Sequence, residues 1–112
     1  MENQIQIRLR EEARQFLIDL PPDTRKKFTL AFRKTEAGFK GEWFEKLAGE
    51  DNLYEFRVSG NNTWYRLLAF WSEKEKSLII GAHGFIKKQN KTPEKEINKA
   101  TVIKREYNKG ET

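Results

Sequence analysis

Basic side chains and a single histidine gather at the end of one short apolar run in the sequence. The run 78–82 is rich in branched residues, which predicts a buried strand. His83, the only histidine of the chain, follows between two glycines, and Lys87 and Lys88 come next. A strand that stops at glycines presents backbone amides and side chains at the end of a sheet. We therefore interpret this strand end as a phosphate-handling site.

Two arginines add to this basic group. Arg57 lies within the predicted strand 53–58, and Arg66 lies within 64–71, which is otherwise apolar on both faces. An arginine in the middle of a strand has to be paired or solvated. Taken singly, each fits a salt bridge to Glu55 or another glutamate better than a site. Two on successive strands, with the lysine pair at the end of the next, favour a common anion site.

The elements that must position these residues can be predicted from periodicity and from turn residues. A strand with one buried face covers 5–9, and a helix runs from Glu11 until Pro21-Pro22. A second helix, capped by Asp23, ends near residue 34 or 35. Three antiparallel strands then occupy 53–82, and a last helix capped by Thr92 covers 94–107. In the connector before the three strands, Trp43 or Phe44 should pack across the rim of the core. The order β-α-α-β-β-β-α predicts a small α+β domain with an antiparallel sheet, its helices packed on one face and the other face partly open.

Length and composition narrow the class of protein. A chain of 112 residues suits one domain, 1–112, with 108–112 as a flexible tail. It has no cysteine and one histidine, which argues against disulfides, zinc–thiolate sites and histidine metal cages, so no metal or cofactor is expected. The apolar runs are too short to cross a bilayer and the first residues lack the basic start of a signal peptide, so the expected location is the cytoplasm.

The positive charge is concentrated after the predicted strand 78–82. Residues 1–86 hold 14 Lys and Arg against 13 Asp and Glu, a net charge of +1, whereas 87–112 hold 8 against 4, a net charge of +4, which together give the +5 of the chain. This distribution is typical of a surface that binds a polyanion. A solvated helix face with many lysines explains the charge equally well.

Three segments, taken together, resemble a known family. They are 53–57 (LYEFR), 64–68 (WYRLL) and 83–88 (HGFIKK) followed by Thr92-Pro93. In this order and spacing they are similar to the RelE/ParE toxin superfamily, and most of all to its HigB-like, phage-derived branch. The resemblance covers nearly the whole chain and implies the toxin of a type II toxin–antitoxin pair, an endoribonuclease that cuts mRNA in the ribosomal decoding site. It also implies inhibition by an antitoxin, which in this branch is typically a helix-turn-helix, HigA-like protein.

The chemistry of such a cut suggests roles for the basic residues. A 2′-hydroxyl attacks the adjacent phosphate, so the site needs a base, an acid and positive groups that stabilise the phosphorane, but no metal. The catalytic candidates are Arg57 and Arg66 for the phosphate, Lys87 and Lys88 for substrate or proton transfer, and His83 as the base; Phe85, by stacking on a base, and Lys91 are the candidates for substrate binding. For His83 and Phe85 the alternative is packing, which is also the role expected of Trp64, Trp71 and Tyr107.

Two other functions remain compatible with the sequence. A ParE-like gyrase inhibitor has the same fold and would not need Arg57, Arg66 and the lysine pair around one phosphate. A non-catalytic nucleic-acid or antitoxin-binding module would bind RNA with a steep salt dependence and never cleave it. Loss of toxicity on Arg66→Ala would argue against the gyrase inhibitor, and RNA cleavage would argue against the binding module.

Overall fold

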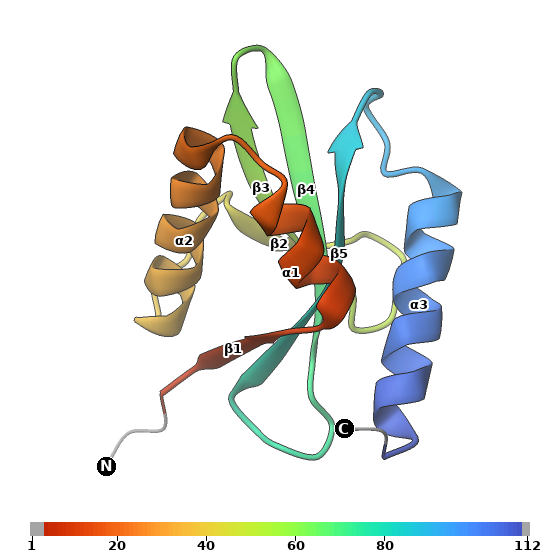
Figure 1. Ribbon diagram of the computed structural model, residues 1–112. Helices are drawn as coiled ribbons and strands as arrows, with labels where there is room; N and C mark the ends of the chain where they lie inside the picture. The colour runs from red at the N-terminus through yellow and green to blue at the C-terminus, as the bar shows by residue number, and fades with distance from the viewer. Residues whose placement is uncertain (1–3, 111–112) are drawn as a thin grey trace.

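A computed structural model describes residues 4–110 and shows one five-stranded sheet with three helices (Figure 1). The strands are β1 (Gln6–Leu9), β2 (Phe44–Lys46), β3 (Tyr54–Gly60), β4 (Thr63–Trp71) and β5 (Leu78–Lys87), and the helices are α1 (Glu11–Ile18), α2 (Pro22–Glu36) and α3 (Glu94–Asn108). The order across the sheet is β1-β5-β4-β3-β2, with β1 parallel to β5 and all other neighbours antiparallel. The predicted α+β class and the antiparallel meander are confirmed, whereas β1 is parallel to β5, so the sheet is not wholly antiparallel as expected, and the short strand β2 is an addition.

The helices cover both faces of the sheet, so the expectation that they share one face was wrong. On one face α1 and α2 bury a cluster that includes Phe28, Phe56 and Leu67. On the other face α3 covers a second cluster that includes Leu68 and Phe70. The physical reason lies in β4, whose residues from Leu67 to Phe70 are all buried, because a strand that is apolar on both faces needs a cover on each side.

Strand β5 continues through both of its glycines instead of stopping at them. A side chain at Gly84 would place its Cβ 2.1 Å from Cδ2 of Phe16, and one at Gly81 would lie 2.6 Å from Cδ2 of Leu9. These glycines therefore let α1 and β1 pack closely against the strand, which corrects the idea that they expose backbone amides to a ligand. The strand that bears His83 reaches Lys87 without a break.

A bulge in β5 decides which side chains share a face. Leu68 pairs with His83, whereas Ala69 pairs with Gly81, so Ala82 is an extra residue opposite β4. In an unbroken strand Lys87 and Ile80 would point to opposite faces, because side chains alternate. The extra residue restores them to the same face, the one that α3 covers in part.

The ends of the elements differ in detail from the sequence-based expectations. Pro21 and Pro93 occupy the N-cap positions of α2 and α3, and neither Asp23 nor Thr92 caps its helix. Asn61 and Asn62 have φ angles of 50° and 61° in the turn between β3 and β4, which confirms the expected hairpin. Asn108, expected in a flexible tail, is the last residue of α3, and residues 111–112 of that tail lie outside the described residues.

Two further expectations concern the packing of the connector before β3 and membrane-spanning segments. Trp43 and Phe44 both pack against the cluster under α2, as expected of the connector. Within residues 4–110 no helix is both long and apolar enough to span a membrane.

Candidate functional site

The arginines and Lys87 meet on the sheet face that α3 leaves partly open. Arg57 is directly opposite Arg66 across β3 and β4, and Trp64 is opposite Lys87 across β4 and β5. Residues paired in this way point to the same face. We call Glu55, Arg57, Trp64, Arg66 and Lys87 the cationic site.

Glu55 holds the two guanidinium groups together. Its carboxylate is only 1% exposed, and its Oε1 lies 3.0 Å from Nε of Arg57 and 3.5 Å from Nε of Arg66. Its Oε2 accepts a hydrogen bond of 2.9 Å from the Thr92 hydroxyl, which ties the loop after β5 to the site. Two positive charges directly opposite each other repel. The carboxylate between them offsets this repulsion, and it leaves 37% of the Arg57 side chain and 11% of the Arg66 side chain exposed.

The salt bridges expected as the alternative to a site are present, and they do not use up the arginines. Arg57 also contacts Glu45 at 3.1 Å and keeps 37% of its side chain exposed. Arg66 donates a hydrogen bond of 3.0 Å from Nη1 to the carbonyl of Tyr65. Its Nε is buried and has no hydrogen-bond partner among the described atoms. Arg66 nevertheless lines two surface hollows, and Arg57 lines one of them, so part of each arginine stays accessible beside the contact with Glu55.

The site is electrostatically tuned at Arg66 and Lys87. Burial lowers the pKa of Lys87, the Arg66 and Arg57 charges lower it further, and Glu55 opposes the shift. Burial likewise lowers the pKa of Arg66, although Glu55 raises it. A lysine whose pKa is lowered by burial and by neighbouring cations can exchange a proton with a substrate more readily than a free one.

Two hollows flank Trp64. One, of about 330 Å³, is lined by Trp64, Arg66, Lys87 and Lys88, with Gln89 and Asn90 from the following loop. The other, also about 330 Å³, lies on the Arg57 side and shares Trp64 and Arg66 with the first. The indole of Trp64 is 55% exposed between them, so its expected packing role was wrong. An exposed aromatic side chain beside cations is the combination that stacks a base and binds its phosphate.

His83 lies away from this site, buried at 1% exposure between β5 and α3. It is four residues from Lys87, which is about 13 Å along a strand. Its Nε2 is 3.0 Å from the Glu96 carbonyl, an acceptor, so Nε2 carries the proton, and the buried Nδ1 has no hydrogen-bond partner among the described atoms. Burial lowers the pKa of His83, against the hydrogen bond to Glu96. His83 is therefore packed in the core, which was the alternative to its role as the base.

The two candidates for substrate binding, Phe85 and Lys91, do not line the hollows beside Trp64. Phe85 is buried in the cluster under α3, so its ring has no face free for a nucleobase. Lys91 is exposed in the loop between β5 and α3, outside the residues that line the hollows beside Trp64. The structure thus brings Arg57, Arg66, Lys87 and Lys88 together, and leaves His83 and Phe85 in the core.

Comparisons with known proteins place this chain in a family. The family model described as Phage derived protein Gp49-like (DUF891) matches residues 15–105. The chain belongs to this family. Among solved structures, this Gp49-like chain is similar to a mutant of the E. coli toxin RelE in its free state, with a TM-score of 0.62 and 14% identity over 94% of this chain and 98% of that one. It is also similar to the toxin–antitoxin complex RelBE2 of Mycobacterium tuberculosis, with a TM-score of 0.55 and 16% identity over 75% and 92% of the two chains.

The Gp49-like chain therefore has a fold similar to that of RelE, as the resemblance implied. No curated protein matches the sequence. The family match spans the whole of β3, β4 and β5, which carry the cationic site.

Sequence reasoning missed the exposed Trp64 and the loop anchor Thr92, and it named Glu55 only as a salt-bridge partner of the arginines. A signal was present for two of these residues. Trp64 is two residues from Arg66 on one predicted strand, and Glu55 is two residues from Arg57 on another, so the alternation of side chains could have placed each pair on one face. The role of Thr92 as an anchor for the loop after β5 had no such signal, because its partner Glu55 is 37 residues away.

Proposed function

We propose that this Gp49-like chain is the toxin of a type II toxin–antitoxin pair, and that it acts as a metal-independent endoribonuclease on mRNA in the translating ribosome. The observation that carries the proposal is the convergence of Arg57, Arg66, Lys87 and Lys88 beside an exposed indole. A gyrase inhibitor of the same fold would not need these groups around one phosphate. The likeness to RelE and to RelBE2 supports the toxin role and the antitoxin partner.

The residues around Trp64 fit the proton and charge transfers of RNA cleavage. The substrate 2′-oxygen forms a bond to phosphorus while the bond to the 5′-oxygen breaks, which gives a 2′,3′-cyclic phosphate and a 5′-hydroxyl. Lys87, with its lowered pKa, takes the proton of the 2′-hydroxyl, and Lys88 in the same hollow protonates the 5′-oxygen. Arg66 stabilises the charge on the phosphorane, and Trp64 stacks on a neighbouring base.

Arg57 and Glu55 act on this site from the next strand. Arg57 adds positive charge on the far side of Trp64, in the second hollow. Glu55 sets the directions of both guanidiniums through its Oε1. His83 is a positioning residue in this scheme, because its bond to the Glu96 carbonyl ties β5 to the first turns of α3.

Controlled expression tests the proposal. The chain is induced from a tightly repressed promoter beside Arg66→Gln and a matched control, Lys76→Gln, whose exposed side chain lies in the turn between β4 and β5. We expect growth arrest and new mRNA 5′ ends within coding regions for the wild type and for Lys76→Gln, and neither for Arg66→Gln. Normal growth on induction of the wild type would contradict the toxin role.

The same cultures separate the other functions. Arrest with unchanged mRNA ends and altered plasmid supercoiling would replace the ribonuclease with a gyrase inhibitor. Arrest with unchanged mRNA ends and normal supercoiling would favour a non-catalytic binding module. The antitoxin is tested by co-expression of the adjacent open reading frame, which should restore growth.

A further inference from the structure

A groove lined by basic side chains continues from the cationic site around the edge of the sheet to α2. The hollow on the Arg57 side shares Trp43, Arg57 and Ser59 with a third hollow of about 240 Å³, whose lining includes Lys27 and Lys34 of α2. The three hollows are thus linked in series through shared residues, from Lys88 at one end to Lys27 at the other. The part of this series beyond Arg57 is the third hollow, with Lys27, Lys34 and Trp43 in its lining. We call this part the α2 groove.

The groove exists because β2 is short. Strand β2 begins only at Phe44, opposite Phe56. The last backbone hydrogen bond on this side of β3 joins the Arg57 amide to the Trp43 carbonyl at 2.9 Å. Beyond this point β3 is an uncovered edge. The carbonyl of Ser59 on this edge accepts a hydrogen bond of 2.7 Å from Nζ of Lys27, which brings a cation of α2 to the sheet.

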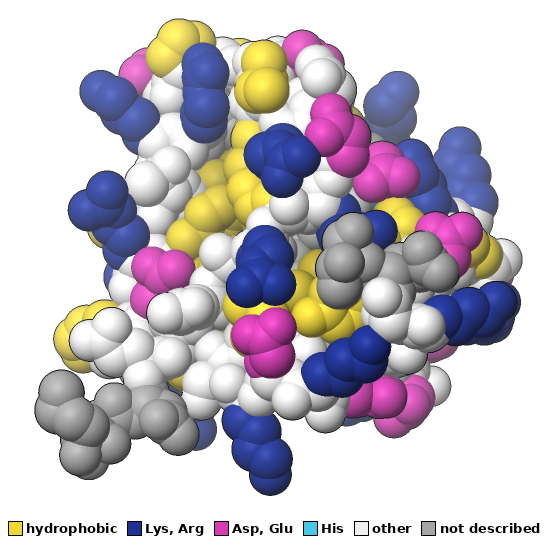
Figure 2. Space-filling view, turned by 60° about the horizontal axis from the view of Figure 1, so that its bottom comes forward, with side chains coloured by type: hydrophobic (Ala, Val, Ile, Leu, Met, Phe, Trp, Pro, Cys, Tyr) yellow, Lys and Arg dark blue, Asp and Glu magenta, His cyan; other side chains and the backbone are white. Residues whose placement is uncertain are grey.

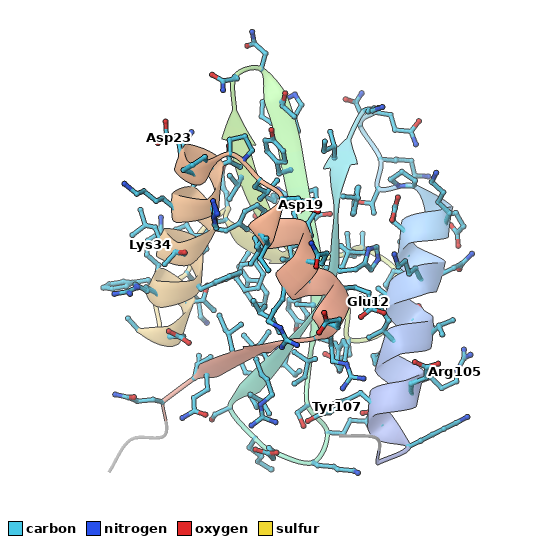
Figure 3. The ribbon with its side chains drawn as sticks, in the orientation of Figure 1. Glu12, Asp19, Asp23, Lys34, Arg105 and Tyr107 are labelled. Carbon is cyan, nitrogen blue, oxygen red and sulfur yellow. The ribbon has the colours of Figure 1, made fainter. Side chains whose placement is uncertain are left out.

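Lys34 is also held in place at the groove. Its Nζ lies 3.9 Å from the ring centroid of Trp43, within the range of a cation–π contact. The indole N–H of Trp43 donates to the hydroxyl of Thr35 at 3.1 Å, and the backbone of Gly41 packs so closely on the ring that a Cβ there would overlap it. Figure 3 shows Lys34 on α2, at the left of the view. Trp43 therefore serves as a fixed support for Lys34, and its ring is not free to stack on a ligand.

The charge of the whole series fits a polyanion. Six basic side chains line the three hollows against one acidic side chain among the described residues, Glu42. A larger hollow at the other end of the molecule is different: Arg8, Arg10, Arg14 and Lys74 line it together with Glu11, Glu12 and Glu75. Two ion pairs, Arg8–Glu75 and Arg14–Glu11, lie in that hollow. Figure 2 shows acidic and basic side chains interspersed on that side.

We propose that the α2 groove binds the sugar–phosphate backbone of the RNA strand outside the linkage held at the cationic site, with Lys27 and Lys34 each contacting a phosphate. This rests on the proposed function for the choice of RNA as the polyanion. The distance across β5, β4 and β3 alone is about 10 Å, which already exceeds one linkage. A strand that leaves the hollow beside Lys87 and passes Trp64 reaches Arg57 and then the groove.

Binding of a non-cleavable oligonucleotide tests the groove without requiring catalysis. Fully 2′-O-methylated, fluorescein-labelled trimers and octamers are titrated with the purified chain, and affinity is followed by anisotropy from 0.05 to 0.3 M salt. For the wild type we expect a higher affinity for the octamer than for the trimer. In Lys27→Gln and in Lys34→Gln this gain should fall by about fivefold at 0.1 M salt, and the salt slope for the octamer should decrease by about 0.7 for each lysine.

Matched controls on the same helix make the result specific. Lys26→Gln removes the same charge from an exposed position of α2 that lines none of the three hollows, so the gain should persist in it. Lys34→Arg keeps both the charge and the contact with Trp43, and should retain most of the gain. Equal losses in Lys26→Gln and Lys34→Gln, or none in Lys27→Gln and Lys34→Gln, would overturn the proposal.

The outcome is separate from that of the proposed function. Length-dependent binding that requires Lys27 and Lys34, in a chain that never cleaves mRNA, would support the groove and contradict the ribonuclease. Cleavage of mRNA by a chain whose oligonucleotide affinity does not depend on these lysines would contradict the groove alone.

Discussion

At the scale of single residues, the buried carboxylate of Glu55 is what permits two arginines to sit opposite each other. It contacts both guanidiniums and the Thr92 hydroxyl while it is only 1% exposed. Removing one partner of a buried charged group leaves the others unpaired and costs more than the net value of the contact. Glu55 is therefore both a stabilising residue and the residue that shapes the anion site.

The first prediction concerns Glu55. The substitution Glu55→Gln should lower the free energy of unfolding by about 1.5 to 3 kcal/mol, the range for hydrogen bonds to charged groups. The control Glu45→Gln removes an exposed contact to the same arginine, and should cost less than about 1 kcal/mol. Denaturant titration measures both. Equal costs would mean that burial does not set the importance of Glu55.

The second prediction concerns His83, whose pKa is lowered by burial. As the pH falls below about 6.5, the unfolded chain takes up a proton at this residue before the folded chain does, so the free energy of unfolding decreases until the lowered folded pKa is reached. Titration with denaturant between pH 8 and 5.5 should show a smaller decrease in His83→Gln than in the wild type. A decrease of the same size in both would show that His83 is not buried in its neutral form.

The third prediction concerns the proton acceptor. If neutral Lys87 takes the proton of the 2′-hydroxyl, the single-turnover rate of cleavage should rise with pH and level off below the ordinary lysine value of about 10.4, because the pKa is lowered. Lys87→Arg keeps the charge but cannot release a proton, and should be slow at every pH with no such rise. A wild-type rate that does not change with pH would remove Lys87 from this role.

At the scale of elements, β5 shows how far the sequence could be interpreted. Its apolar start and its lysine end were predictable from residue types, and Arg57 and Arg66 could be placed on neighbouring strands. The bulge at Ala82 could not, because alternation gives no sign of an extra residue. The two glycines were visible but ambiguous, since the need for close packing appears only when Phe16 and Leu9 are in place.

The fourth prediction tests that packing. Gly84→Ala should destabilise the fold by about 1 to 3 kcal/mol, because its Cβ would meet the Phe16 ring at 2.1 Å. The same substitution in a Phe16→Val background should cost less, because the obstructing ring is gone. Gly60→Ala, where the nearest side-chain atom is 3.2 Å away, is the milder control. If the cost is independent of residue 16, α1 does not press on this strand.

At the scale of the whole molecule, the sheet is covered unevenly, and the site lies in what remains open. Helix α3 packs against β4 and β5, and the first two helices cover the other face, so the ends of β3, β4 and β5 nearest the α3 loop stay accessible (Figure 1). The sequence of the predicted helix 94–107 gave no indication of which face of the sheet that helix would cover. The choice was determined by β4, which is apolar on both sides.

The central claim is that the cationic site binds and cleaves one RNA linkage, and cleavage on programmed ribosomes tests it most directly. Purified wild-type chain, Arg66→Gln and Lys76→Gln are each incubated with ribosomes carrying a defined mRNA and an empty decoding site, after thermal melting shows that all three are folded. The account predicts cuts within the decoding-site codon by the wild type and by Lys76→Gln, and a rate at least 100-fold lower, on the order expected for loss of a charged transition-state contact, for Arg66→Gln. Equal rates for Arg66→Gln and Lys76→Gln would contradict it.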